Sequence, residues 1–113
     1  MLFRSARLTD MIKTSGINVA PAEVESYLAG HPAVAEVAVV GAPHPSRGEV
    51  VIAFVTVTDP AVDGEALQAW CRAGIAGYKV PWRVVVLDEL PRTATGKLTR
   101  STLVEQARTE AAS

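Results

Sequence analysis

Two polar loops, one near each end of the chain, contain the residues whose types and spacing could do chemistry. Residues 10–19 read DMIKTSGINV and residues 91–98 read PRTATGKL, so each loop has a glycine and a single lysine. Catalysis and binding need positioned polar groups, whereas packing needs apolar periodicity, so polar loops of this kind more often serve function. Two such loops in one short chain predict a small domain with two working surfaces.

Lys97 is the candidate for electrostatic chemistry in the second loop. A lysine side chain is a compact positive charge on a long flexible stem, so it could reach an anionic group in another site. The segment is not a phosphate-binding loop of the form G-x-x-x-x-G-K-[ST], because Pro91 stands at the first glycine position and Leu98 replaces the final Ser or Thr. The alternative is an ordinary solvated lysine after a turn glycine.

Gly16 is the candidate in the first loop. It could be a turn residue with a positive φ, which glycine adopts without steric cost. Alternatively, the absence of a side chain could leave room for a ligand to pass. The sequence alone leaves both interpretations open.

Other reactive residue types have plainer interpretations. Cys71 falls on the apolar face of an expected helix, which favours a buried structural thiol over a nucleophile. His31 and His44 each precede a proline at a turn, and no nucleophile or carboxylate is spaced for them, so both are expected to be structural or solvated. Arg47 and Glu49 are expected to lie in a loop between strands, as a surface pair that contributes little to stability.

Composition limits the classes of function. The chain has 113 residues, 49% of them hydrophobic, and a net charge of -1. This composition predicts one domain and gives no electrostatic attraction to nucleic acid or anionic membranes. No apolar run has membrane-spanning length, residues 1–5 lack the apolar stretch of a signal peptide, and no Cys/His set has metal-ligand spacing. The single cysteine makes a reducing cytoplasm the expected location.

The apolar patterns predict a small α+β domain on an antiparallel or mixed sheet, with about three helices and a short N-terminal β-hairpin. Helices are expected from Pro21 to Gly30, over residues 63–75, and after Thr102, which with Glu105 could form a capping box. Residues 50–55 are apolar on both faces, which predicts a covered central strand. The expected strands are residues 3–7, 11–19 with a break at Ser15 and Gly16, 34–40, 50–58 and 83–87.

Six ordered elements make the chain resemble the C-terminal domain of the acyl-CoA synthetases. These enzymes belong to the adenylate-forming superfamily, which also contains firefly luciferase and the adenylation domains of nonribosomal peptide synthetases. The resemblance covers about residues 3–103, and the sequence of its elements is most similar to that of bacterial fatty-acyl-CoA ligases. The elements are residues 7–13 (RLTDMIK), 15–25 (SGINVAPAEVE), 31–34 (HPAV), 47–49 (RGE), 78–81 (YKVP) and 90–97 (LPRTATGK).

The resemblance implies two half-reactions. A carboxylic acid and ATP form an acyl-adenylate and pyrophosphate, and the thiol of coenzyme A then displaces AMP. A large N-terminal domain holds most of the contacts to ATP, Mg²⁺ and the acid, and a small C-terminal domain rotates between the two steps. Residues 1–113 are expected to be that C-terminal lid domain, excised or truncated from its own N-terminal adenylation domain and inactive alone.

Individual residues take their implied roles from the motifs. Lys97 is implied to be catalytic in adenylation, where its charge would contact the acid's oxygens and the α-phosphate. Arg7 is implied to bind the nucleotide's ribose, and Thr9 and Asp10 to form the hinge. No metal ligand is implied in this chain. The thiolation face, which would admit coenzyme A, is implied to contain Lys13, Ser15, Gly16, Asn18 and Lys79.

Two positions depart from the family pattern. Thr9 stands where the hinge residue is usually a charged Asp or Lys, and Ala6 stands where glycine usually precedes the arginine. Two alternatives stay open: the lid of an adenylation domain that serves a carrier protein, and a non-catalytic, stand-alone interaction module. Nucleic-acid binding is disfavoured, because the chain lacks a basic stripe and stacking aromatic residues.

Overall fold

The computed structural model describes residues 11–75, 80–91 and 100–112. The α+β domain with three helices and an N-terminal hairpin predicted from the sequence is confirmed. The predicted strand at residues 3–7 lies outside the described residues. In chain order the elements are β1 (Ile12–Thr14), β2 (Ile17–Val19), α1 (Pro21–Ala29), β3 (Val34–His44), β4 (Gly48–Val57), α2 (Gly64–Gly74), β5 (Arg83–Val86) and α3 (Arg100–Ala112).

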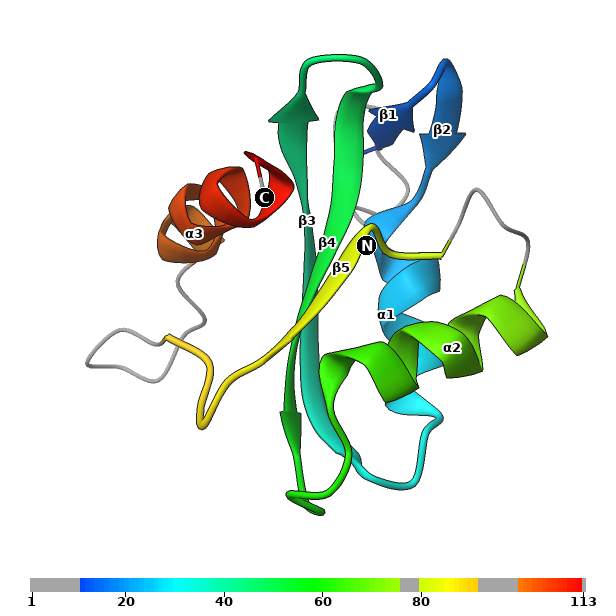
Figure 1. The fold of residues 1–113 in the computed structure, drawn as a ribbon, viewed down its shortest axis with the longest axis vertical. Helices are drawn as coiled ribbons and strands as arrows, with labels where there is room; N and C mark the ends of the chain where they lie inside the picture. The colour runs from blue at the N-terminus through cyan, green and yellow to red at the C-terminus, as the bar shows by residue number, and fades with distance from the viewer. Residues whose placement is uncertain (1–10, 76–79, 92–99, 113) are drawn as a thin grey trace, which may run out of the picture.

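Strand β4 organises the sheet. Along one edge it pairs antiparallel with β3, from the end of β4 back to the turn at His44 and Gly48. Its other edge is shared by two short strands, since β1 pairs with it antiparallel at Gly48 and β5 pairs with it in parallel from Ile52 to Val55. With β2 beyond β1, the result is a mixed five-stranded sheet (Figure 1). Among the described residues, the ladder leaves residues 49–51 without a paired strand on that second edge.

The two faces of the sheet carry separate hydrophobic clusters. Helices α1 and α2 cover one face, with Val24 and Leu28 from α1 and Leu67 and Cys71 from α2 in the cluster. Helix α3 covers the opposite face (Figure 1). Residues 50–55 of β4 supply both clusters alternately, and each is at most 2% exposed. The covered central strand predicted from this apolar run is therefore confirmed.

The helices begin where local sequence signals predict in two of the three described cases. Pro21 is the first residue of α1, a position where its missing N–H costs nothing. Asp63 caps α2, its side chain accepting a hydrogen bond from the Ala66 N–H over 2.9 Å. The predicted cap at Thr102 is wrong, because α3 is already helical at Arg100. The buried apolar face of α3 begins at Leu103. Because the helix starts before this residue, Leu103 lies within a complete helical turn.

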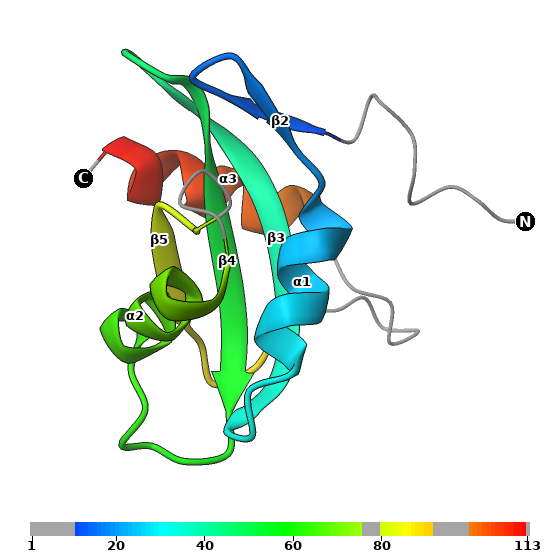
Figure 2. The same ribbon diagram turned by 90° about the vertical axis from the view of Figure 1, so that its right-hand side faces the viewer.

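Strand β3 runs further than predicted, since residues 41–44, which were expected to leave the sheet, still pair with β4. This longer ribbon brings the β3–β4 turn to the same end of the sheet as the β1–β2 hairpin (Figure 2). None of the described helices is both long and apolar enough to cross a membrane.

Candidate functional site

The β1–β2 hairpin closes through a two-residue turn at Ser15 and Gly16. Both residues have positive φ, 53° for Ser15 and 83° for Gly16. These angles match a type I′ turn, whose twist suits two-residue hairpins. The turn interpretation of Gly16 is therefore confirmed for its backbone. A Cβ built on Gly16 meets no atom within 4 Å, so packing within the described chain leaves open space there.

The hairpin has two unlike faces because side chains alternate along a strand. Ile12 and Val19 form a cross-strand pair, and both are buried in the cluster beneath α1. Lys13 and Asn18 form the next pair, are exposed, and point to the opposite face. Of the thiolation residues expected from the motif, Lys13 and Asn18 therefore share the exposed face of the hairpin.

A cavity of about 470 Å³ opens beside the hairpin, along the part of β4 that has no paired strand. Thr14, Ser15 and Ile17 line it from the hairpin side, and Val50 and Val51 form its floor on β4. Ile17 is 42% exposed, an unusual position for a large apolar side chain. The lining is completed by Arg47, Gln68, Arg72, Val80, Pro81, Trp82 and Arg83.

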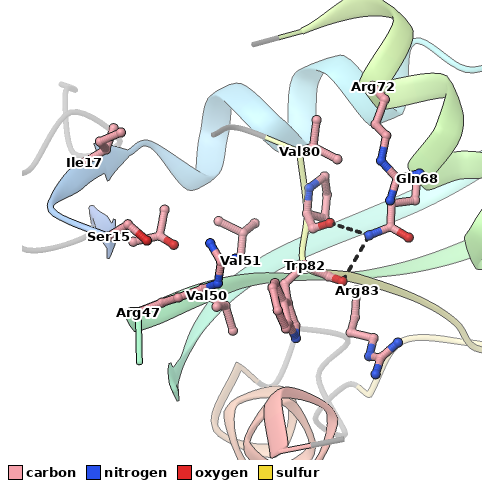
Figure 3. Close-up of a pocket in the computed structure, with 12 residues that line it drawn as sticks. Ser15, Ile17, Arg47, Val50, Val51, Gln68, Arg72, Val80, Trp82 and Arg83 are labelled. Atoms are coloured by element: carbon pink, nitrogen blue, oxygen red, sulfur yellow. Dashed lines mark hydrogen bonds between the residues drawn. The ribbon is translucent and has the colours of Figure 1, made fainter. Parts of the chain in front are cut away.

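An indole and a guanidinium stand together in this cavity. The Arg47 guanidinium carbon lies 4.7 Å from the ring centroid of Trp82, which is a cation–π contact. The His44 ring meets the same indole at an angle of 66°, with centroids 5.0 Å apart. Figure 3 shows Arg47 reaching from its turn into the space between Ser15 and Trp82. The exposed arginine is thus held against one side of the cavity rather than free in solvent.

The opposite wall comes from α2. Gln68 donates hydrogen bonds from Nε2 to the carbonyl oxygens of Pro81 and Trp82, over 2.9 and 3.0 Å. These bonds hold the segment before β5 against the helix and so fix Trp82. Arg72, one helical turn after Gln68, is exposed at the cavity rim (Figure 3). Arg83 also lines the cavity, but its guanidinium points away from Arg72 in this view.

The lining is suited to binding a ligand that contains phosphate. Guanidinium groups pair with phosphate oxygens bidentately, and an indole face offers a stacking surface. Among the described lining residues there is no histidine and no carboxylate. The described residues also include no group of three or more potential metal ligands.

The structure places some of the predicted site residues and not others. Ser15 lines the cavity, Gly16 sits beside it in the turn, and Lys13 and Asn18 lie on the far face of the hairpin. The motif residues Arg7, Thr9, Asp10, Lys79 and Lys97 all lie outside the described residues.

The sequence patterns did not mark Arg72 and Trp82 as cavity residues, and the roles of Arg47 and Glu49 were predicted wrongly. Arg72 and Trp82 carried no motif that would have marked them. Arg47 and Glu49 were predicted to be a weak surface pair, and this is wrong. Arg47 packs on Trp82, and Glu49 accepts a hydrogen bond from the Lys13 backbone. No local sequence signal marks Arg47 as a cavity residue, because its place beside the hairpin depends on the length of the β3–β4 ribbon.

The remaining reactive side chains are structural. Burial raises the pKa of the Cys71 thiol to about 11, so it is protonated at neutral pH and is not a nucleophile. His31 accepts a hydrogen bond at Nδ1 from the Ala33 N–H over 3.0 Å and packs edge-on against Trp70. His44 accepts one from the Ser46 N–H over 3.2 Å. These contacts order the turns in which the two histidines lie.

Comparison with known proteins identifies the family. Residues 23–97 match the AMP-binding enzyme C-terminal domain. This match covers most of the chain, and the chain belongs to that family. The resemblance to the C-terminal domains of acyl-CoA synthetases is thereby confirmed.

Full-length relatives and solved structures agree. A long-chain-fatty-acid–CoA ligase of Escherichia coli O6:H1 is 47% identical over 102 residues, which is 90% of this chain and 18% of the relative. A fatty acyl CoA synthetase of Mycobacterium tuberculosis has a TM-score of 0.81 at 39% identity, over 92% of this chain and 21% of that one. An o-succinylbenzoate CoA synthetase of Bacillus subtilis, solved with its product analogue OSB-NCoA, has a TM-score of 0.74 at 43% identity, over 88% and 20%. The chain therefore spans about a fifth of these relatives' length.

Proposed function

We propose that this chain is the mobile C-terminal domain of an ATP-dependent, AMP-forming acid–CoA ligase, with a fatty acid as the carboxylic acid substrate. The observation that carries the proposal is the cavity in which Ser15 of the hairpin turn faces Arg47, Arg72 and Trp82. The family assignment and the CoA ligases among its relatives support the same activity.

In this proposal the cavity binds the nucleotide end of coenzyme A during thiolation. Coenzyme A carries phosphates and an adenine at one end and a thiol on a flexible arm at the other. Arg47 and Arg72 would bind phosphate, and the indole of Trp82 would hold the Arg47 guanidinium in position. The thiol arm would then pass over the turn at Gly16, where no atom of the described chain lies within 4 Å of a Cβ.

The adenylation half-reaction is proposed to use a second surface and residues outside the described ranges. Lys97 would neutralise charge on the carboxylate and the α-phosphate, and Arg7 would contact the ribose, with Thr9 and Asp10 at the hinge. Lys79 would assist at the coenzyme A phosphates. ATP and Mg²⁺ would be held mainly by a large N-terminal domain, since the described residues offer no cluster of metal ligands. Cytoplasmic action is part of this proposal.

A carrier protein as the thiol partner is a less suitable alternative. The phosphopantetheine arm of a carrier protein has no adenosine and no 3′-phosphate. A cavity lined by three arginines beside the hairpin suits those groups, and the relatives described above are CoA ligases.

The test compares coenzyme A with pantetheine, which lacks all of the nucleotide phosphates. In a two-domain enzyme with this chain as its C-terminal domain, Arg47→Ala and Arg72→Ala should each raise KM for coenzyme A about tenfold. The rate with pantetheine should stay unchanged. Arg108→Ala, on the opposite face in α3, is the matched control. If the arginine variants leave KM for coenzyme A unchanged, or impair both thiols alike, the proposed site is wrong.

A further inference from the structure

Glu49 lies where the hairpin meets the sheet. Its Oε1 accepts a hydrogen bond from the backbone N–H of Lys13 over 2.9 Å. The register that pairs Thr14 with Gly48 would place Lys13 opposite Glu49 in the next step of the ladder. The ladder stops there, so the carboxylate takes the place of a backbone acceptor. A side chain of β4 thus continues the attachment of β1 after strand pairing has ended.

A glycine on the neighbouring strand makes room for this arrangement. A Cβ on Gly41 of β3 would lie 3.1 Å from Ile12 Cγ1 and 3.3 Å from Glu49 Oε2. Both distances are shorter than ordinary van der Waals contact, so a side chain there would push on the hairpin and on the carboxylate together. Ile12 is 3% exposed and fills the space that Gly41 leaves. The side chains of Ile12 and Glu49 therefore both lie against Gly41 of β3.

Among the described residues, two hydrogen bonds and one strand pairing join the hairpin to the start of β4 and the turn before it. The Ser15 N–H donates to the Arg47 carbonyl oxygen over 2.8 Å, Thr14 pairs with Gly48, and the Lys13 N–H donates to Glu49. Of these three, the bond to Glu49 alone uses a side chain, and its acceptor is an ionisable carboxyl group. A hydrogen bond to a carboxylate is stronger than one between neutral groups. A substitution of Glu49 can therefore loosen the attachment of the hairpin to β4 without changing the backbone acceptors.

We infer that Glu49 is a positioning residue for the thiolation half-reaction. By holding the Lys13 backbone it fixes the hairpin, and therefore the distance between the turn at Gly16 and the arginine cavity. Glu49 does not line the cavity, so it acts through the hairpin and not by touching the coenzyme. This inference rests on the proposed function, because it assumes that the Gly16 turn and the cavity bind one ligand.

Three substitutions of Glu49 separate the effect of its side-chain length from the effect of its charge. Glu49→Gln keeps the reach and an acceptor oxygen but removes the charge. Glu49→Asp keeps the charge but shortens the side chain by one methylene, so the oxygen no longer reaches Lys13. Glu49→Ala removes both. Glu105→Ala is the control, because Glu105 is exposed on α3 and only pairs with Arg108 at 3.8 Å.

The first measurement needs no activity and uses the 113-residue chain itself. Amide hydrogen exchange of Lys13, followed by NMR, reports whether the bond to Glu49 is present. Its protection should fall about tenfold in Glu49→Ala and Glu49→Asp, and stay within about threefold of the parent in Glu49→Gln. Amides of β4 that pair with β3 should keep their protection, which shows that the domain is folded. Unchanged Lys13 protection in Glu49→Ala would overturn the inference.

The second measurement follows each half-reaction in the two-domain enzyme. Thiolation of preformed acyl-adenylate should lose about tenfold to a hundredfold in kcat/KM for coenzyme A in Glu49→Ala and Glu49→Asp, and recover in Glu49→Gln. Adenylation should be unchanged in all three. Equal loss in both half-reactions, or full thiolation by Glu49→Asp, would contradict a positioning role.

The two proposals fail in different ways. If Arg47→Ala and Arg72→Ala do not affect KM for coenzyme A, the proposed cavity is wrong, even if Glu49 still protects the Lys13 amide. If those variants impair thiolation while Glu49→Asp does not, the cavity stands and the role of Glu49 is overturned.

Discussion

The backbone N–H of Ser15 donates a hydrogen bond to the carbonyl oxygen of Arg47 over 2.8 Å. This bond joins two turns that are far apart in the sequence, one closing the β1–β2 hairpin and one closing the β3–β4 ribbon. Gly48, the next residue, has a φ of 80°, which a residue with a side chain adopts only with strain. The hairpin side of the candidate cavity is therefore hydrogen-bonded to the turn that contains Arg47, and a change in either turn should affect the other.

Gly16→Trp in the two-domain enzyme should block thiolation while leaving adenylation intact. A Cβ at this position meets no atom of the described chain within 4 Å, so the added bulk is expected to obstruct a ligand or a facing domain. Acyl-adenylate should therefore form and accumulate while turnover with coenzyme A falls strongly, as measured by AMP release and thioester formation.

Gly16→Ala is the control for backbone strain at this site. It introduces the cost of a positive φ without adding bulk. If alanine and tryptophan impair thiolation equally, Gly16 is needed only as a turn residue, and the proposed thiol path over it is wrong.

Lys97→Ala in the same enzyme should affect the other half-reaction. A positive charge that acts on the adenylation transition state is expected to contribute about a hundredfold to that rate. Thiolation of preformed acyl-adenylate should largely survive, because in the proposed mechanism Lys97 acts only in adenylation. Single-turnover assays of each step would show this, and equal damage to both steps would argue against two working surfaces.

Gly64→Ala should destabilise the domain although alanine favours helices. Gly64 is the first residue of α2, and a Cβ there would collide with the carbonyl oxygen of Val84 in β5. The helix would have to move away from the strand, at a cost of about 1–3 kcal/mol in the free energy of unfolding. Urea denaturation would measure the loss. Glu65→Ala, the exposed neighbour, should change stability by only about 0.5 kcal/mol, and a Gly64→Ala variant as stable as the parent would show that α2 packs further from β5.

Cys71 should make the stability of the domain fall at alkaline pH. Burial raises its pKa from the ordinary value of 9.0 to about 11, so between these values the unfolded chain loses the proton and the folded chain keeps it. The unfolded state then binds fewer protons, and the free energy of unfolding decreases as pH rises, by about 1 kcal/mol at pH 10. The dependence begins near the unfolded pKa of 9.0 and is negligible below about pH 8.

Urea denaturation of the parent and of Cys71→Ala at pH 8 and pH 10 isolates this effect. The difference between the two proteins should narrow by about 1 kcal/mol at the higher pH. In addition, a thiol reagent at pH 8 should label Cys71 only as fast as the domain opens. Fast labelling of the folded domain would mean that the thiol is accessible.

Local signals in the sequence determined much of the secondary structure of this protein. Residues 50–55 are apolar at every position and rich in β-branched residues, which favours a strand covered on both faces. Ser15 and Gly16 between two short strands predicted a turn, because glycine adopts positive φ freely. Pro21 marked the start of α1, where a residue without an N–H is tolerated. Each of these features depends on neighbours a few residues away, which the sequence displays directly.

The tertiary structure alone decided how distant segments meet. Arg47, Arg72 and Trp82 line one cavity because β1 and β5 share one edge of β4 and leave an interval between them. No local pattern records which strand pairs with which, or in what register. For the same reason Glu49 was interpreted as a surface residue, although it bonds to the Lys13 backbone 36 positions earlier. Periodicity and turn propensity describe short stretches of chain, whereas a binding surface depends on long-range pairing, and that is specified only when the whole sheet is assembled.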